Sequence, residues 1–262
     1  MAFPSRIWGS YGDEKASQST RIGSLPLGTR MELPDGRVFA HAKAGGTSLV
    51  AGQLQMTMAE IDTSRRYEMA VAADAAIGAT SVTLTTGGSA LVADDYADGY
   101  LYINDEAAAE GEGRVFKIKS SASAAAASSA VFTLADGDTI DQALVAGSSV
   151  AGLRCNEFQN VVIYKAGTIV GQPAGVAPVD VTASYYCWLQ RRGAVGALTA
   201  ATAGAVGAGA VACLETNGAF KAYVIASGTT AGKERDVSIL GYWMASAAGT
   251  AGDYSLIYLQ LE

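Results

Sequence analysis

The chain has very little of the residue types that most enzymes use for catalysis. Of its 262 residues only one is a histidine, His41, which lies in an extended run beside Lys43. Any Ser-His-Asp or Cys-His arrangement would need that one side chain, and one histidine with scattered cysteines forms no cluster for a transition metal. The sequence therefore predicts a protein that is not an enzyme, with no catalytic residue, no metal site and no cofactor.

Cysteine is also scarce. Cys155, Cys187 and Cys213 are odd in number and have no CxxC spacing, which argues against a disulfide scaffold and a zinc ribbon. The pattern is typical of half-buried thiols in a reducing cytoplasm. The first residues, MAFPSRIWGSYGDEK, have no apolar core of signal-peptide length, so we expect no export by the secretory route.

Charge is sparse and mostly acidic. Charged residues make up 16% of the chain, and the net charge is −7. Phosphate binding needs clustered Lys and Arg, which argues against a nucleic-acid partner. The densest basic positions are only Arg65–Arg66, Lys117 with Lys119, and Arg191–Arg192.

The chain has no strongly hydrophobic span, although residues 193–214 carry no charge. Most residues there are Ala, Gly and Thr, which add little to bilayer insertion, and each glycine weakens an isolated helix by about 1 kcal/mol. The glycine spacing is G-x-x-G-x-G and no Walker lysine follows, so a nucleotide loop is not indicated. We expect a strand, a glycine-rich turn and a strand, with no membrane partner. Whether the small residues of 193–212 lie within one subunit or between subunits stays open.

Short strands with alternating apolar residues are what the sequence does contain. Val82 and Leu84 alternate with polar neighbours, as do Phe116 and Ile118, and Asp-Gly pairs follow at turn spacing. This pattern predicts an all-β fold of small β-sandwich or barrel domains with little helix. Pro34-Asp35-Gly36 predicts a hairpin turn.

The expected organisation has four parts. Residues 1–28 form an extended N-terminal arm, which is either a frayed terminus or an arm that orders on a partner. Residues 29–74 form a hairpin and a connecting segment, with a possible helical turn near 58–66, that packs with the C-terminal domain. Residues 75–153 form an inserted small barrel or sandwich, and residues 154–262 form a C-terminal β-domain. In that domain YYCWLQRR is expected as an amphipathic strand, and the last strand, DYSLIYLQLE, is expected to pair inside a sheet.

An acidic stretch, residues 94–112, is the one candidate cation site. Its seven carboxylates could bind calcium, but the spacing does not fit an EF-hand loop, and solvated turns are the favoured interpretation. A glycosidase pair is also conceivable, but no feature selects two of these acids.

Three stretches resemble a group of tailed-phage structural proteins. They are SLPLGTRMELPDGRVFAHAKAGGTSLVAGQLQ, the middle segment with AIGATSVTLT and YADGYLYINDEAAAEGEGRVFKIKSS, and VDVTASYYCWLQRRG. The similarity covers roughly residues 24–195. One departure is Tyr186-Cys187, where the group's pattern has a glycine before the tryptophan.

The resemblance implies a virion protein, and in particular a head decoration or cement protein. Such a protein is made in the host cytoplasm and binds the major capsid protein on the outer capsid surface. It is expected to form a homo-oligomer, with a trimer favoured over a dimer. The side chains expected at capsid or subunit interfaces are Phe3, Ile7, Trp8, Tyr11, Tyr186 and Trp188.

Two other functions are consistent with the same sequence. One is a tail or fibre subunit, which shares the β-rich composition and the tendency to assemble. The other is a carbohydrate-binding or glycan-hydrolysing β protein that would use the acids of residues 94–112 and aromatics such as Tyr185, Tyr242 and Trp243.

Overall fold

The computed structural model describes residues 6–57, 63–104, 111–164, 171–200, 207–214, 216–222, 239–245 and 252–261. These residues form an all-β protein, as the alternating sequence pattern predicted, and the helical turns among them are short 3₁₀ turns. The chain divides into two compact units. The larger unit comprises Phe3–Ala59 and Phe158–Glu262, and the smaller unit comprises Glu60–Glu157.

The smaller unit is a closed barrel with the strand order β10-β7-β6-β11-β8-β9. Its strands are β6 (Met69–Ala73), β7 (Ser81–Thr85), β8 (Tyr100–Ile103), β9 (Val115–Ser121), β10 (Ser129–Leu134) and β11 (Val150–Arg154). Because β6 belongs to the barrel, the barrel begins before the expected residue 75. The expected helical turn is described only at its end, where Thr63–Arg65 forms a 3₁₀ turn, and residues 58–62 lie outside the described residues.

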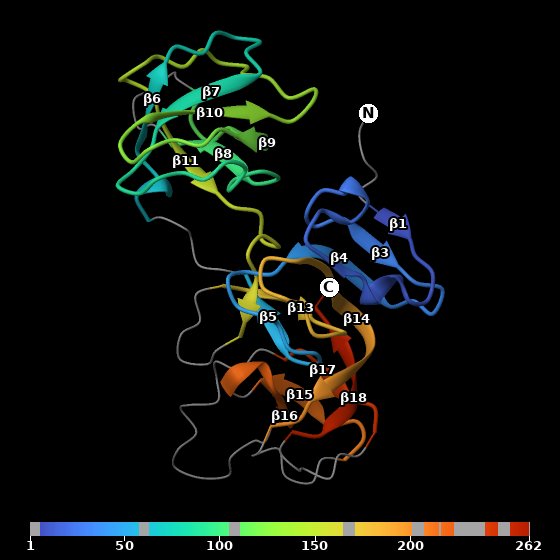
Figure 1. Cartoon of the computed structure of the whole chain (residues 1–262). Helices are drawn as coiled ribbons and strands as arrows, with labels where there is room; N and C mark the ends of the chain where they lie inside the picture. Colours follow the sequence, from blue (N-terminus) through green and yellow to red (C-terminus); the bar gives the residue numbers. More distant parts are fainter. Residues whose placement is uncertain are drawn as a thin grey trace. The chain divides into compact units, whose positions relative to one another are not determined.

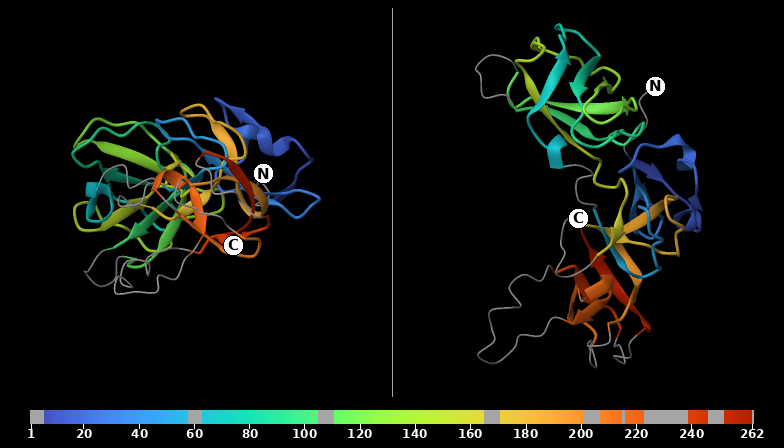
Figure 2. Two further views of the ribbon diagram at one scale, coloured as in Figure 1. Left: turned by 90° about the horizontal axis from the view of Figure 1, so that it is seen from below. Right: turned by 60° about the vertical axis from the view of Figure 1, so that its left-hand side comes forward.

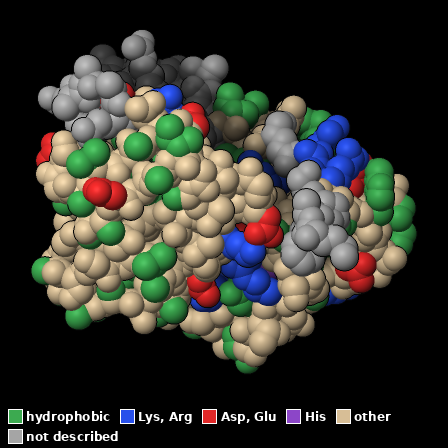
Figure 3. Space-filling view, turned by 90° about the horizontal axis from the view of Figure 1, so that it is seen from above, with side chains coloured by type: hydrophobic (Ala, Val, Ile, Leu, Met, Phe, Trp, Pro, Cys, Tyr) green, Lys and Arg blue, Asp and Glu red, His purple; other side chains and the backbone are tan. Residues whose placement is uncertain are grey.

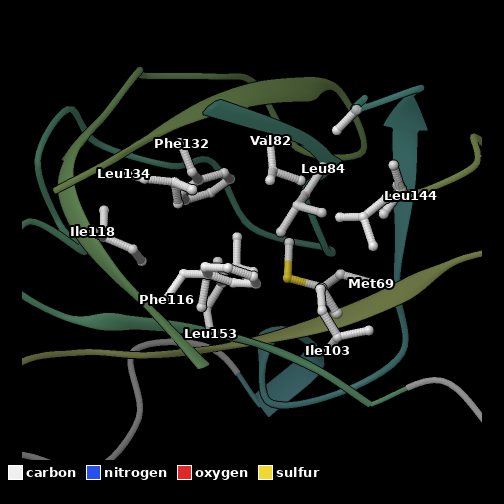
Figure 4. Packing of buried hydrophobic residues seen from close by; sticks show 14 of the residues in the cluster. Met69, Val82, Leu84, Ile103, Phe116, Ile118, Phe132, Leu134, Leu144 and Leu153 are labelled. Atoms are coloured by element: carbon white, nitrogen blue, oxygen red, sulfur yellow. The ribbon is translucent and has the colours of Figure 1, made fainter. Parts of the chain in front are cut away.

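Alternating side chains fill the barrel. Val82, Leu84, Phe116, Ile118 and Phe132 are each at most 5% exposed and point toward one another (Figure 4). The residues that alternate with them along each strand are half-buried or exposed. Turn chemistry joins the strands, with positive φ at Asp98 and Gly137 as the Asp-Gly pairs predicted.

The larger unit is built on a twelve-stranded sheet with the main order β1-β3-β4-β14-β18-β17-β15-β16. Its strands are β1 (Arg6–Trp8), β2 (Ser17–Gln18), β3 (Arg30–Glu32), β4 (Val38–Lys43), β5 (Leu54–Met56), β12 (Val162–Ile163), β13 (Pro173–Val176), β14 (Tyr186–Leu198), β15 (Val211–Leu214), β16 (Phe220–Ala222), β17 (Gly241–Trp243) and β18 (Tyr254–Gln260). Its short 3₁₀ turns are η1 (Asp13–Lys15), η2 (Ile22–Ser24) and η4 (Thr216–Gly218).

The hairpin predicted at Pro34-Asp35-Gly36 joins β3 to β4. The N–H of Leu33 donates to the carbonyl of Arg37 at 3.0 Å, and Gly36 supplies the positive φ of 81°. β4 then pairs antiparallel with the first half of β14. The second half of β14 pairs with β18, and β18 lies between β14 and β17 (Figures 1 and 2). The prediction that the last strand is paired inside a sheet is therefore confirmed.

The glycine and alanine run is partly a strand. β14 continues through Gly193, where φ is 95°, as far as Leu198, and β15 begins at Val211. Residues 201–206 lie outside the described residues. Both expected strands are present. The first of them, β14, extends to Leu198 and so includes residues that were expected to lie in the glycine-rich turn.

The barrel is inserted between two neighbouring strands of the larger unit. β5 precedes the insertion and β12 follows it, and Met56 pairs with Val162 across the two strands. The insertion therefore begins after one strand of an antiparallel pair and ends before the other strand of the same pair.

No helix among the described residues is both long and apolar enough to cross a membrane.

Candidate binding surface of the N-terminal segment

The described part of the N-terminal segment packs on its own chain. β1 pairs in parallel with β3, with Trp8 opposite Glu32, and β2 pairs with the start of β14. Ile7 and Ile22 pack against a buried cluster that contains Trp188. Both interpretations of residues 1–28, a frayed terminus and an arm that awaits a partner, are therefore wrong for residues 6–28, because these apolar side chains are partly buried inside the unit.

An ion-paired carboxylate fixes this segment to the hairpin. Glu14 in η1 is 5% exposed, and its carboxylate accepts a hydrogen bond from the N–H of Gly12 at 2.6 Å. Arg37 lies 3.6 Å from the Glu14 carboxylate and donates to Asp35 at 2.7 Å. A buried carboxylate is costly unless it is paired, so Arg37 stabilises η1 against the hairpin turn. Partial burial raises the pKa of Asp35, but hydrogen bonds from Arg37 outweigh it and hold that pKa below its usual value.

Two aromatic side chains of this fixed segment face solvent. Trp8 is 73% exposed and Tyr11 is 63% exposed. The Arg6 guanidinium lies 4.8 Å from the centre of the Trp8 ring and also pairs with Glu32. This cation–π contact limits the orientations of the Trp8 ring. β1 ends the main path of the sheet, so its outer edge carries backbone groups that another strand can pair with.

The other side chains expected at interfaces lie in different places. Phe3 lies outside the described residues. Ile7 is half-buried, and so is Tyr186, whose ring stacks on His41 at 5.7 Å. The prediction is wrong for Trp188, which is 2% exposed inside the larger unit.

Trp188 is buried because both faces of this part of β14 are covered. Cys187 and Leu189 point into one core cluster, while Trp188 packs with Met31 and Phe39 in another. YYCWLQRR is therefore not an amphipathic strand. The N-terminal segment supplies the second layer, and sequence alternation alone could not reveal that cover.

Arg6 and Glu32, which orient Trp8, are not among the site residues predicted from the sequence. A usable signal existed, because Arg6 and Trp8 are two residues apart and so share one face if the triplet RIW is a strand. The triplet was not recognised as a strand, since three residues are too few to show a period.

His41 and the described acids of residues 94–112 have structural partners. His41 is 0% exposed, and its Nδ1 lies 3.1 Å from the carbonyl of Pro26. The Asp94 carboxylate accepts a hydrogen bond from the N–H of Ser121 at 3.2 Å, and that of Asp95 accepts one from Val92 at 3.3 Å. Within the described ranges, no group of three His, Cys, Asp or Glu side chains could hold a metal ion. Residues 105–110 lie outside those ranges.

The three cysteines are free, and they differ in accessibility. Cys187 and Cys213 are each 1% exposed, whereas Cys155 is half-buried. Burial raises the pKa of the Cys187 thiol to about 12, which disfavours the reactive thiolate.

We therefore expect a short iodoacetamide pulse on the native protein to label Cys155 and to leave Cys187 and Cys213 unmodified. Peptide mass spectrometry reads the modification at each position. The same pulse in denaturant is the control and should label all three thiols. Native labelling of Cys187 as fast as that of Cys155 would contradict its burial.

Charges on the face drawn in Figure 3 are scattered among the described residues. In Figure 3 the Lys and Arg side chains in view form small groups with Asp and Glu nearby, rather than one extended basic field. That face lacks the dense positive potential that phosphate backbones require.

Comparison of the chain with protein-family models, with curated proteins and with solved structures found no match.

Proposed function

We propose that this protein is a non-enzymatic structural protein of a tailed-phage virion that binds the outer surface of the assembled capsid and stabilises it. The resemblance of residues 24–195 to tailed-phage structural proteins supports the proposal. The observation that carries it is the exposed pair Trp8 and Tyr11 on an N-terminal segment that the rest of the chain holds in place.

The proposed contact uses general features of protein interfaces. Aromatic side chains are enriched at binding hot spots, and anchors that are ordered beforehand lose less conformational entropy on binding. Arg6 orders Trp8, and Arg37 and Glu14 fix the turn just beyond Tyr11. The outer edge of β1 can add backbone hydrogen bonds to an extended segment of the major capsid protein.

Repetition supplies the stabilising effect. Each copy makes one modest contact, and a capsid offers many equivalent sites. If each copy bridges neighbouring capsid subunits, many weak contacts act together against expansion or rupture of the shell.

We expect the double variant Trp8→Ala and Tyr11→Ala to bind capsids that lack this protein at least tenfold more weakly than the wild type, since loss of one hot-spot side chain costs about 2 kcal/mol or more. Co-sedimentation over a range of protein concentrations measures the affinity. The matched control is Tyr67→Ala, which removes a tyrosine that is 58% exposed in the barrel unit.

Two results would contradict the proposal. Wild-type protein that never sediments with capsids would remove the capsid as partner. Electron microscopy of the parent virion with density for this protein on the tail would favour a tail or fibre subunit. Wild-type affinity of the double variant would keep the capsid as partner and exclude the N-terminal contact.

A further inference from the structure

The last strand is apolar on both faces from Leu256 to Leu259, and its outward row ends in the exposed Gln260. On the inward face of β18, Ile257 and Leu259 are 0% exposed and belong to the core. On its outward face lie Tyr254, Leu256 and Tyr258. Antiparallel strands with one solvated face usually alternate apolar with polar residues, whereas strands covered on both faces are apolar throughout. From Leu256 to Leu259 the composition of β18 is that of a strand whose outer face is also covered.

Neighbouring strands extend this outward surface. Tyr258 is opposite Tyr242 of β17 and Ala194 of β14, and the two tyrosine rings stack at 5.3 Å with an angle of 8°. Leu256 is opposite Gly196 of β14. The backbone N–H of Met244 donates to the carbonyl of Leu256 at 3.0 Å, which places Met244 in the same row. We call this surface the outer β18 face and define it by Ala194, Gly196, Tyr242, Met244, Leu256 and Tyr258.

The six residues of the outer β18 face are uncharged, and the exposed pair Arg192 and Gln260 borders the face at the next position along β14 and β18. Tyr242 is 43% exposed, Met244 44% and Leu256 42%. Isolated exposed apolar residues are common, but adjoining ones in register form a patch, and such patches mark interaction surfaces. The first half of β14 is covered by the N-terminal segment at Trp188, whereas among the residues that the structure describes no such segment packs over these later positions.

Gly196 gives a second and independent indication. It lies inside β14 without a positive φ, and a Cβ placed on it would meet no atom within 4 Å. By contrast, Gly193 is explained within the chain, because its φ is 95° and a Cβ would crowd Arg37. Glycine inside a strand costs about 0.5–1 kcal/mol relative to alanine, and it often marks a place where another molecule approaches closely.

We propose that the outer β18 face is the contact between two copies of this chain. Small side chains on β14 lie directly beside large ones on β18. A two-fold axis parallel to the strands and between β14 and β18 places Leu256 of one copy over Gly196 of the partner subunit. The same rotation places Tyr258 over Ala194 of the partner subunit, and each contact occurs twice.

A second copy fits this surface because the surface complements itself. An isologous contact requires each projection and its matching hollow to lie on one face, as Leu256 and Gly196 do. The six residues of the face are uncharged, so like charges of two copies come near each other only at its border with Arg192. The inference stands independently of the function proposed above, and it predicts a dimer where the family resemblance favoured a trimer.

Gly196→Leu tests the proposal. A Cβ at this position meets no atom within 4 Å, so the fold is expected to persist, but the leucine side chain fills the hollow that receives Leu256 of the partner subunit. In sedimentation equilibrium at micromolar concentrations, the wild type is expected at twice the 26.7 kDa chain mass. The variant is expected to self-associate at least tenfold more weakly, which is a typical effect of overpacking.

Gly88→Leu is the matched control. Gly88 lies in the barrel unit, also has no positive φ and also has open space around a Cβ, so this variant is expected to associate like the wild type. Leu256→Lys is the second variant, which places a charge on the face and is used if Gly196→Leu fails to show native tryptophan fluorescence. It is likewise expected to weaken dimerisation at least tenfold.

Three results would overturn the proposal. They are a monomeric wild type over the whole concentration range, a wild-type trimer, and dimerisation of a folded Gly196→Leu or Leu256→Lys variant that equals the wild type. Equal losses in Gly196→Leu and Gly88→Leu would also count against it, because a general effect of added leucine would then explain both.

Discussion

Phe132→Ala is expected to lower the free energy of unfolding of the barrel unit by about 3–5 kcal/mol, the usual cost of removing a buried phenylalanine. Phe132 is 0% exposed, and its ring meets that of Tyr96 edge to face at 6.3 Å. It lies on β10, which pairs with β7 and β9. The cavity left by the missing ring would therefore be bordered by three paired strands. A closed barrel has no free edge strand that could move inward to fill it.

The distribution of tryptophan allows the two units to be followed separately. Trp8, Trp188 and Trp243 are the three tryptophans, and all lie in the larger unit. In a urea titration of Phe132→Ala, the far-UV circular dichroism transition should move to lower urea while the tryptophan fluorescence transition stays in place. Val131→Ala is the control on the adjacent position, which is 42% exposed, and it should change the stability by less than about 0.5 kcal/mol. If both signals shifted together, the two units would unfold as one cooperative system.

Gly241→Ala is expected to destabilise the larger unit by more than about 3 kcal/mol, through two effects that add. The φ of Gly241 is 154°, which residues with a side chain rarely adopt. A Cβ there would also overlap the carbonyl oxygen of Tyr258 on the paired strand β18. The backbone oxygen cannot move aside without breaking the ladder between β17 and β18.

Tryptophan fluorescence is the natural readout for this variant, because Trp243 is two residues away and 1% exposed. The control is Gly252→Ala. Gly252 has a φ of 86°, but a Cβ there meets no atom within 4 Å, so only the backbone strain of about 1–2 kcal/mol is expected. Equal losses of stability in the two variants would mean that β18 shifts to relieve the overlap.

The sequence was most informative where a strand buries one face. Val82 with Leu84, and Phe132 with its neighbours, alternate cleanly because the barrel has one interior and one solvated exterior. The turns were predictable for a similar reason, since the positive φ at Gly36 and Gly137 is a local requirement with a local residue preference. The all-β class followed from these two signals.

The candidate binding surface was harder to predict, because it depends on pairings between distant residues. The parallel pairing of β1 with β3 joins two segments that no tight hairpin turn connects. The three residues RIW alone do not predict this pairing. The same contact buries Trp188, which looked like an outward residue of an amphipathic strand. Trp8 and Tyr11 were selected as exposed anchors from their polar surroundings, and they are exposed. What could not be foreseen is that the segment carrying them is fixed.

The pairing of Met56 with Val162 has a practical consequence. Neighbouring strands are about 4.8 Å apart, so the chain leaves the larger unit and returns to it at two points that lie close together. A foreign domain whose own ends lie close together could be spliced between Ala59 and Phe158 in place of the barrel, without stretching the ladder on either side.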